Sequence, residues 1–158
     1  MSQPVADATD KHIPTSSSLL TRRSTYIYTA VAIVSLLGLA DATYLTIEHV
    51  TGQSVRCTII AGCSEVLSSK YAVVGGFPLA MIGAAAYFSV FSLATLAAFG
   101  YRFATTLLNL SVAAMLLVSL WLVYLQAFVI GSFCQYCLFS AAITLILAVL
   151  LLIRRRKP

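Results

Sequence analysis

The sequence predicts an all-α integral membrane protein, a bundle of four transmembrane helices with an outer loop that carries a short interfacial helix. The first observation is composition: of the 158 residues, 60% are hydrophobic and only 9% are charged. A soluble domain needs far more charge to cover its surface. The second observation is four long apolar runs, since about 20 apolar residues suffice for a helix to cross the hydrocarbon core. The third is that the basic residues cluster beside these runs, as membrane anchors do, so no nucleic-acid partner is expected.

The chain is predicted to have three parts. Residues 1–24 are polar, contain two prolines and a run of three serines, and are predicted to be a disordered cytoplasmic tail. They are not predicted to be a cleaved signal peptide, because the apolar run that follows is too long and lacks a small-residue cleavage site. Residues 25–153 form the membrane domain, and residues 154–158 form a basic cytoplasmic tail.

Apolar runs and turn residues give the order of the elements. Between the first and second spans, residues 51–76 form a polar loop in which 64–71 are predicted to make a short helix on the membrane surface. Gly75-Gly76-Phe77-Pro78 is predicted to be a turn and a helix start, because proline fits the first helical turn. The four spans are predicted over about residues 26–50, 78–99, 103–130 and 137–153.

Four spans place both ends of the chain on one side of the membrane. That side would hold Arg22, Arg23, Arg102 and the cluster 154–157, whereas the other side would hold only Arg56 and Lys70. Under the positive-inside rule the termini are then cytoplasmic. All four cysteines therefore fall on the outer face, which in a bacterium is the oxidising compartment. The sequence predicts a multi-pass protein of the bacterial inner membrane.

The four cysteines form two close pairs. Cys134 and Cys137 stand three positions apart at a helix start, within disulfide reach, where the helix dipole favours a thiolate on the first. Cys57 and Cys63 lie in the long outer loop, with five residues between them. A mobile pair and a fixed pair can form a relay for thiol–disulfide exchange. The fixed pair would need a two-electron acceptor soluble in lipid, and a quinone has that chemistry.

A quinone pocket needs apolar walls, aromatic groups and one or two hydrogen-bond donors. Asp41 is an acid inside the first span, where it is costly unless paired or functional. It is either a helix-pairing residue bonded to a neighbouring Thr or Tyr, or a proton carrier. Trp121 and Tyr124 also fit the aromatic belt at a membrane interface. The candidate wall residues are Tyr136, Phe133, Phe139, Phe77, Trp121 and Tyr124.

Several motifs together resemble the bacterial homologues of vitamin K epoxide reductase. The likeness covers about residues 26–153, which is all but the tails. The motifs that carry it are Gly38-Leu39-Ala40-Asp41-Ala42-Thr43-Tyr44-Leu45, Cys57 with Cys63, Cys63-Ser64-Glu65-Val66-Leu67-Ser68-Ser69-Lys70-Tyr71, Gly76-Phe77-Pro78-Leu79 and Cys134-Gln135-Tyr136-Cys137.

The resemblance implies a four-helix enzyme that oxidises a periplasmic thioredoxin-like protein and reduces ubiquinone or menaquinone. It implies that Cys57 and Cys63 are the shuttle pair, that Cys63 passes electrons to Cys134 through a transient disulfide, and that Cys137 sits against the quinone ring. Ser69 would hold the loop near the active site. Many bacterial members carry a fused thioredoxin-like domain, whereas this chain stops at Pro158, so a separate partner protein is expected. The chain itself is expected to be a monomer.

Two other functions are weighed beside this one. The animal enzymes, which reduce vitamin K epoxide, have an Asn and a Tyr where Leu79 and Ala141 stand here, and this favours plain quinone reduction. A non-enzymatic four-span scaffold would use its disulfides only to brace the outer loop. A zinc site is not expected, because the five-residue gap and the apolar setting do not suit four thiolates.

Overall fold

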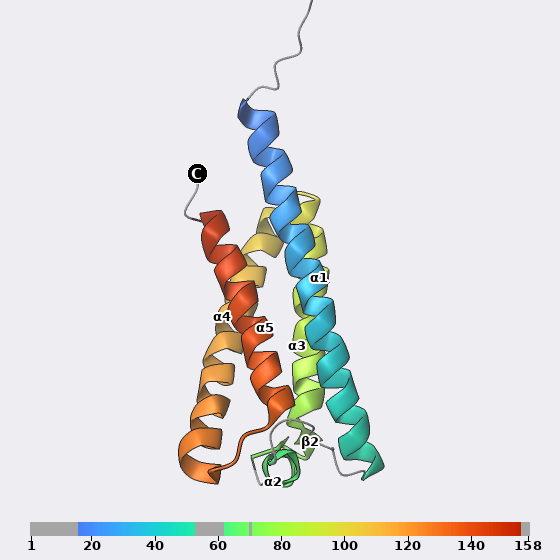
Figure 1. Ribbon diagram of the computed structural model, residues 1–158. Helices are drawn as coiled ribbons and strands as arrows, with labels where there is room; N and C mark the ends of the chain where they lie inside the picture. Colours follow the sequence, from blue (N-terminus) through green and yellow to red (C-terminus); the bar gives the residue numbers. More distant parts are fainter. Residues whose placement is uncertain (1–15, 53–61, 70, 156–158) are drawn as a thin grey trace, which may run out of the picture.

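The computed structural model describes residues 16–52, 62–69 and 71–155, with side chains from residue 24 onward. Within these ranges four helices are long and apolar enough to cross a membrane: Ser24–Thr51, Leu79–Ala98, Arg102–Ile130 and Gln135–Arg155. They run up and down in one bundle, so that the start of the first helix and the end of the last lie at the same end (Figure 1). The predicted four-helix membrane bundle is confirmed.

The elements follow the sequence closely. In chain order they are α1 (Ser16–Thr51), α2 (Cys63–Leu67), β1 (Val73–Val74), β2 (Phe77–Pro78), α3 (Leu79–Ala98), α4 (Arg102–Leu125), the π-helix η1 (Gln126–Ile130) and α5 (Gln135–Arg155). The main difference is that α1 begins at Ser16, whereas a disordered tail was predicted up to residue 24. Extending a helix that has already nucleated gains one hydrogen bond for each residue fixed, so a polar sequence can continue it.

The helices form a closed ring in which α1 packs on α3 and α5, and α4 packs on the same two helices. Two tyrosines bridge the diagonals of this ring. The hydroxyl of Tyr28 on α1 pairs with Oγ1 of Thr105 on α4 at 3.0 Å. The guanidinium of Arg154 lies 4.7 Å from the centre of the Tyr28 ring and ties α5 to the same point. Tyr87 on α3 bonds to α5 deeper in the bundle.

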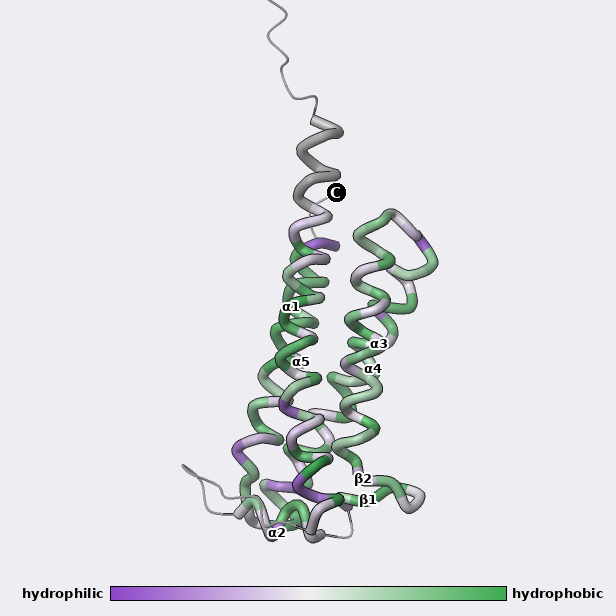
Figure 2. The backbone as a smooth tube through the Cα atoms, turned by 90° about the vertical axis from the view of Figure 1, so that its right-hand side faces the viewer, coloured by the Kyte–Doolittle hydropathy of each residue, from purple (hydrophilic) through white to green (hydrophobic). Residues whose placement is uncertain are grey.

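The helix α2 and the strands β1 and β2, which come between α1 and α3 in the chain, lie at one end of the bundle (Figures 1 and 2). Strands β1 and β2 are antiparallel, with Val74 opposite Phe77. Gly75 and Gly76 join them with φ of 61° and 86°, the positive values that a two-residue hairpin turn of this kind requires. The predicted turn is therefore present, although Pro78 precedes α3 in an extended conformation instead of lying in its first turn. The predicted surface helix is also shorter, ending at Leu67.

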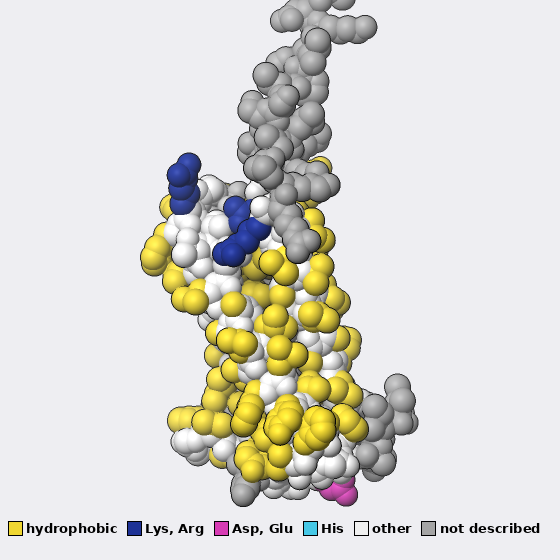
Figure 3. Space-filling view, turned by 90° about the vertical axis from the view of Figure 1, so that its left-hand side faces the viewer, with side chains coloured by type: hydrophobic (Ala, Val, Ile, Leu, Met, Phe, Trp, Pro, Cys, Tyr) yellow, Lys and Arg dark blue, Asp and Glu magenta, His cyan; other side chains and the backbone are white. Residues whose placement is uncertain are grey.

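Charge is segregated along the bundle. Arginine side chains lie at the end where α5 finishes, an acidic side chain is visible at the opposite end, and the flank between them is hydrophobic (Figure 3). The described arginines are Arg102, Arg154 and Arg155, and Glu65 belongs to α2 at the other end. The side chains of Arg22, Arg23, Arg56 and Lys70 lie outside the described residues.

Candidate functional site

Cys134 and Cys137 stand at the start of α5 as free thiols. Cys134 is completely buried, and its carbonyl accepts the helix hydrogen bond from Leu138 N–H at 3.0 Å. A hydrogen bond from the Cys137 thiol lowers the pKa of Cys134 from 9.0 to about 7, against the opposing effect of burial. Near neutral pH a large fraction of Cys134 is therefore thiolate, which is the form that attacks disulfides.

Gln126 fixes the backbone at Cys134. Its Oε1 accepts a hydrogen bond from the Cys134 N–H at 3.0 Å, and the side chain is only 3% exposed. Gln126 opens η1, and such short π-helical turns often occur at functional sites. Sequence reasoning missed this residue. The available signal was an amide in the apolar run Leu120–Ile130, where a polar group is costly unless it has a partner or a function.

Cys63 lies against Cys134 in one buried cluster with Leu45 and Val66. It is disulfide-bonded, whereas Cys134 is free. The structure thus brings together one cysteine from each predicted pair. Cys57 lies outside the described residues.

Two contacts hold α2 in this place. Gly62, just before α2, has a φ of 144°, and a Cβ there would lie 2.9 Å from the carbonyl oxygen of Phe133. Only glycine allows so close an approach of the two backbones. The Ser132 hydroxyl donates a hydrogen bond to Oε2 of Glu65 at 2.7 Å. The loop that carries Cys63 is therefore seated on the segment that carries Cys134.

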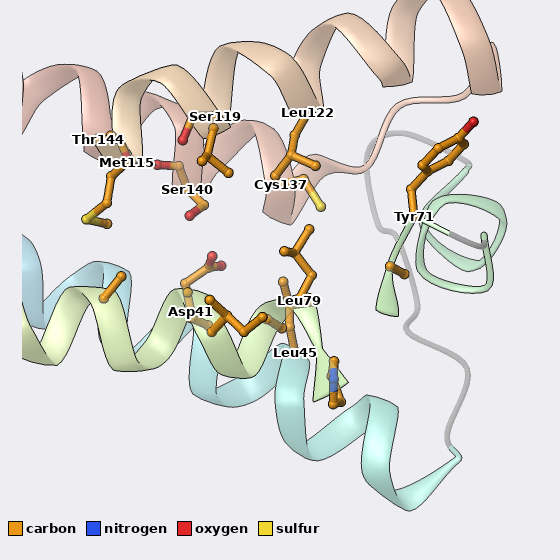
Figure 4. Close-up of a pocket in the computed structure, with 18 of the residues that line it drawn as sticks. Asp41, Leu45, Tyr71, Leu79, Met115, Ser119, Leu122, Cys137, Ser140 and Thr144 are labelled. Atoms are coloured by element: carbon orange, nitrogen blue, oxygen red, sulfur yellow. Dashed lines mark hydrogen bonds between the residues drawn. The ribbon is translucent and has the colours of Figure 1, made fainter. Parts of the chain in front are cut away.

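A cavity of about 460 Å³ lies inside the ring of helices and reaches α2 and the hairpin. This volume falls in the range of small-molecule sites, and most of the lining is apolar. Cys137 lines it from α5 and Asp41 lines it from α1, and Figure 4 shows both side chains pointing into the space. Other described lining residues include Leu45, His49, Val66, Ser69, Tyr71, Leu79, Ile82, Gly83, Tyr87, Ser89, Ser111, Ala114, Met115, Val118, Ser119, Leu122, Gln126, Ser140 and Thr144.

The exposed part of the cavity lining belongs to α3 and α4. Four of the lining residues are exposed, and all four lie on these two helices, which indicates that the cavity opens between them. This flank of the bundle is apolar, so a hydrophobic molecule could reach the cavity from the lipid. The four residues are Ile82, Ser89, Ala114 and Val118.

The predicted site residues divide between the cavity and the surface. Asp41, Ser69 and Cys137 line the cavity, and the Ser69 hydroxyl donates to the Val66 carbonyl at 2.7 Å, within the segment that holds Cys63. The predicted aromatic residues do not line it. Tyr71 and Tyr87 contribute aromatic rings to the lining, and most of the other lining residues are aliphatic or small. The predicted wall residues that lie outside the lining are Phe77, Trp121, Tyr124, Phe133, Tyr136 and Phe139.

The outward-facing aromatics contact one another. Trp121 and Tyr124 are 60% and 50% exposed, and their rings stack with centroids 5.9 Å apart. The Tyr124 ring lies 5.0 Å from that of Phe128, so the three side chains share one outer face of α4 and η1. The positions of Trp121, Tyr124 and Phe128 suit contacts with lipid at a membrane interface. Tyr136 differs, because it is partly buried against the cluster of Cys63 and Cys134, and its ring packs on Tyr44 with centroids 5.4 Å apart.

Comparison with known proteins agrees with this architecture. The sequence profile of the vitamin K epoxide reductase family matches residues 29–152, which include most of the four spans and all four cysteines. The chain is also similar to the thiol-disulfide oxidoreductase LTO1 of Arabidopsis thaliana, with 38% identity over 112 residues. That match covers 64% of this chain and 29% of LTO1, so the chain spans less than a third of this relative. With its four-helix bundle, its paired cysteines and a profile match over most of its length, this chain belongs to the vitamin K epoxide reductase family.

Proposed function

We propose that the chain is a membrane thiol oxidoreductase that forms disulfides in a separate thioredoxin-like protein and passes the electrons through two cysteine pairs to a membrane quinone. The observation that carries this proposal is that the two cysteines at the start of α5 face different surroundings. Cys134 is buried against the disulfide-bonded Cys63, whereas Cys137 faces a cavity with an open side on the apolar flank. One thiol can exchange with the loop while the other meets a lipid-soluble acceptor.

The proposed relay balances at each step. A partner dithiol reduces the loop disulfide and becomes oxidised itself. The Cys63 thiolate then attacks Cys134 in a Cys134–Cys137 disulfide, which forms a transient Cys63–Cys134 bridge and releases Cys137. Cys57 resolves the bridge and restores the loop disulfide. The reduced pair Cys134 and Cys137 then gives two electrons and two protons to a quinone, which leaves as quinol while the disulfide forms again.

The chemistry of the cavity supports a quinone as the acceptor. Its apolar walls suit a hydrophobic ring, and its open side would let an isoprenoid tail extend into lipid. Leu79, which stands where the animal enzymes have an Asn, lines the cavity with an alkyl side chain. This favours ubiquinone or menaquinone over vitamin K epoxide as the substrate.

The charge distribution supports an orientation in the bacterial inner membrane. Arg102, Arg154 and Arg155 lie at the end of the bundle away from α2 and the cysteines (Figure 3). Basic residues accumulate on the cytoplasmic side of membrane proteins. We therefore place the termini in the cytoplasm and the cysteines on the periplasmic side, where a thioredoxin-like partner would meet them.

The test is an anaerobic turnover experiment on the purified full chain in detergent. A reduced thioredoxin-like protein and ubiquinone or menaquinone are mixed with it, and quinone absorbance is followed together with partner thiols. We expect one quinone to disappear for every two partner thiols, and we expect Cys137→Ala to stop both. If neither quinone nor thiols are consumed by the wild type, the bundle is a scaffold with bracing disulfides and the proposal is wrong.

A further inference from the structure

Asp41 is a polar group that the relay does not use. It lies in α1 within the span Ser24–Thr51, and its Oδ2 is buried with no hydrogen-bond partner among the described residues. Its carboxyl group points into the cavity from the side opposite Ser140 and Cys137 (Figure 4). An unpaired carboxylate is costly in such apolar surroundings, whereas the protonated acid keeps an O–H to donate.

The hydroxyl groups around Asp41 have other partners. The Tyr87 hydroxyl lies 2.9 Å from both the Ser140 carbonyl and Ser140 Oγ, and 3.0 Å from Thr144 Oγ1. On α1 itself, the hydroxyls of Thr43 and Thr46 donate to backbone carbonyls of their own helix. Because these hydroxyls bond elsewhere, the contacts do not support the prediction that Asp41 pairs with a neighbouring Thr or Tyr. Its hydrogen-bonding capacity is therefore directed at whatever occupies the cavity.

The titratable groups that face Asp41 come from three sides. Asp41 interacts electrostatically with Tyr87 of α3 and with Cys134 and Cys137 at the start of α5. His49 lines the same cavity two turns further along α1, about 12 Å toward the end that carries α2 at about 1.5 Å per residue. Tyr71 lines it from the segment after α2. The described lining residues of α4 include no titratable side chain.

From this placement we infer that Asp41 is the acid that protonates the quinone oxygen remote from Cys137. The inference rests on the proposed function. The two oxygens of a quinone lie on opposite sides of its ring, so thiols at one end of the cavity cannot reach both. Asp41 and Cys137 line the cavity from different helices, and each can serve one oxygen.

The proton balance closes when solvent is included. Oxidation of Cys134 and Cys137 to a disulfide releases two electrons and, counted from the dithiol, two protons, one of which a Cys134 thiolate has already given to solvent. The electrons go to the quinone, one proton goes to the oxygen near Cys137, and Asp41 gives its proton to the other oxygen. A proton from solvent, equivalent to the one that Cys134 gave up, then restores the acid form of Asp41. The net reaction is dithiol plus quinone giving disulfide plus quinol.

The experiment measures a single turnover. Wild type, Asp41→Asn, Asp41→Glu and Glu48→Gln are reduced with excess dithiol, freed of it without oxygen, and mixed with saturating quinone. We expect Asp41→Asn to reduce quinone about 100-fold more slowly, the lower end of the usual effect of removing a general acid, and Asp41→Glu to recover part of the rate. Glu48→Gln removes a carboxyl group from the same helix outside the cavity lining and should react as the wild type does.

Infrared difference spectroscopy gives a readout that does not depend on turnover. Quinone added to the oxidised wild type should shift one protonated carboxyl C=O band, and this band should be absent from Asp41→Asn and present in Glu48→Gln. Because the band is recorded in the wild type, the measurement stands even if a variant folds poorly. A wild type without such a band would overturn the assignment.

The results separate the two proposals. If the wild type does not reduce quinone, the quinone oxidoreductase itself is wrong. If the wild type reduces quinone and Asp41→Asn does so at the same rate, only the role of Asp41 is wrong. If the loss in Asp41→Asn disappears when quinone is raised above the concentration that saturates the wild type, Asp41 merely binds the ligand, and its role as an acid is also wrong.

Discussion

The backbone N–H of Cys134 donates its hydrogen bond to the side chain of Gln126, 3.0 Å away and across the bend between η1 and α5. This contact replaces the hydrogen bond that a continuous helix would have provided. Gly131, with a φ of 69°, allows the chain to reverse between the two residues. The position of the Cys134 backbone is thus set by an amide eight residues earlier in the chain.

Gln126→Leu is expected to leave the Cys134 N–H buried without a partner. The unsatisfied donor should lower stability by about 1–3 kcal/mol and slow exchange between Cys63 and Cys134. Gln126→Glu keeps an acceptor oxygen at the same place and should lose less stability. Thermal unfolding in detergent measures the first effect, and trapping of the mixed disulfide measures the second. Equal unfolding temperatures for Gln126→Leu and wild type would show that the contact does not support the site.

The pKa of Cys134 is expected to depend on the donor at position 137. Its thiolate should appear as the pH rises through about 7, because the hydrogen bond from Cys137 favours the charged form. Cys137→Ala removes this donor and leaves only the backbone N–H groups of residues 136 and 137 to oppose burial, so the thiolate should appear at higher pH. Cys137→Ser supplies an O–H and should keep the pKa low. The thiolate absorbance in the ultraviolet, recorded against pH, follows the change, and similar curves for the Ala and Ser variants would contradict the stated cause.

Gly38 is expected to be essential for packing α1 against α3. A Cβ at Gly38 would overlap the ring of Tyr87, which is 1% exposed and bonded to α5. Gly38→Ala should therefore destabilise the bundle by about 1–3 kcal/mol through overpacking. Gly83→Ala is the matched control, since a Cβ there would lie at an ordinary 3.9 Å from the Cβ of Ala42. Thermal melting of both variants should separate them, and a tolerant Gly38→Ala would mean that Tyr87 can move.

Gly62→Ala is expected to push α2 away from the start of α5. The new Cβ would lie 2.9 Å from the Phe133 carbonyl oxygen, so Cys63 should exchange with Cys134 more slowly, while the rate at which the reduced Cys134–Cys137 pair reduces quinone stays the same. Gly52→Ala controls for backbone strain, because Gly52 also has a positive φ but has nothing within 4 Å. Rapid-quench trapping of the Cys63–Cys134 bridge compares the two variants. Equal slowing in both would point to strain instead of displacement.

Trp121→Leu is expected to leave quinone reduction unchanged. Its ring is 60% exposed and stacks on Tyr124 outside the cavity lining. The Michaelis constant for quinone should therefore match the wild type, whereas Leu122→Trp on the adjacent, cavity-lining position should raise it by filling the space. Steady-state kinetics in the same detergent would decide, and a large rise in that constant for Trp121→Leu would place a quinone site on the outer face of α4.

Local chemistry made much of this protein predictable. The four spans follow from runs of apolar residues long enough to cross a membrane, and the reversal before α3 follows from Gly75 and Gly76. The cysteine pair on α5 was recognisable from its spacing at a helix start. Asp41 was singled out because an acid inside a span needs a reason to be there, whereas Ser69 was predicted from the family resemblance, and both line the cavity.

Which side of each helix points toward the bundle interior was decided only by the tertiary structure. In a span, side chains toward lipid and toward the bundle are both apolar, so helical periodicity does not tell which is which. This is why Trp121 and Tyr124 were expected at a cavity that is walled instead by residues such as Met115 and Leu122. The contacts of Gln126 with Cys134, and of Gly62 with Phe133, join segments that the sequence keeps apart. The sequence by itself determined the helices and the reactive groups, and their packing determined which groups meet, because contact depends on helix rotation and backbone approach.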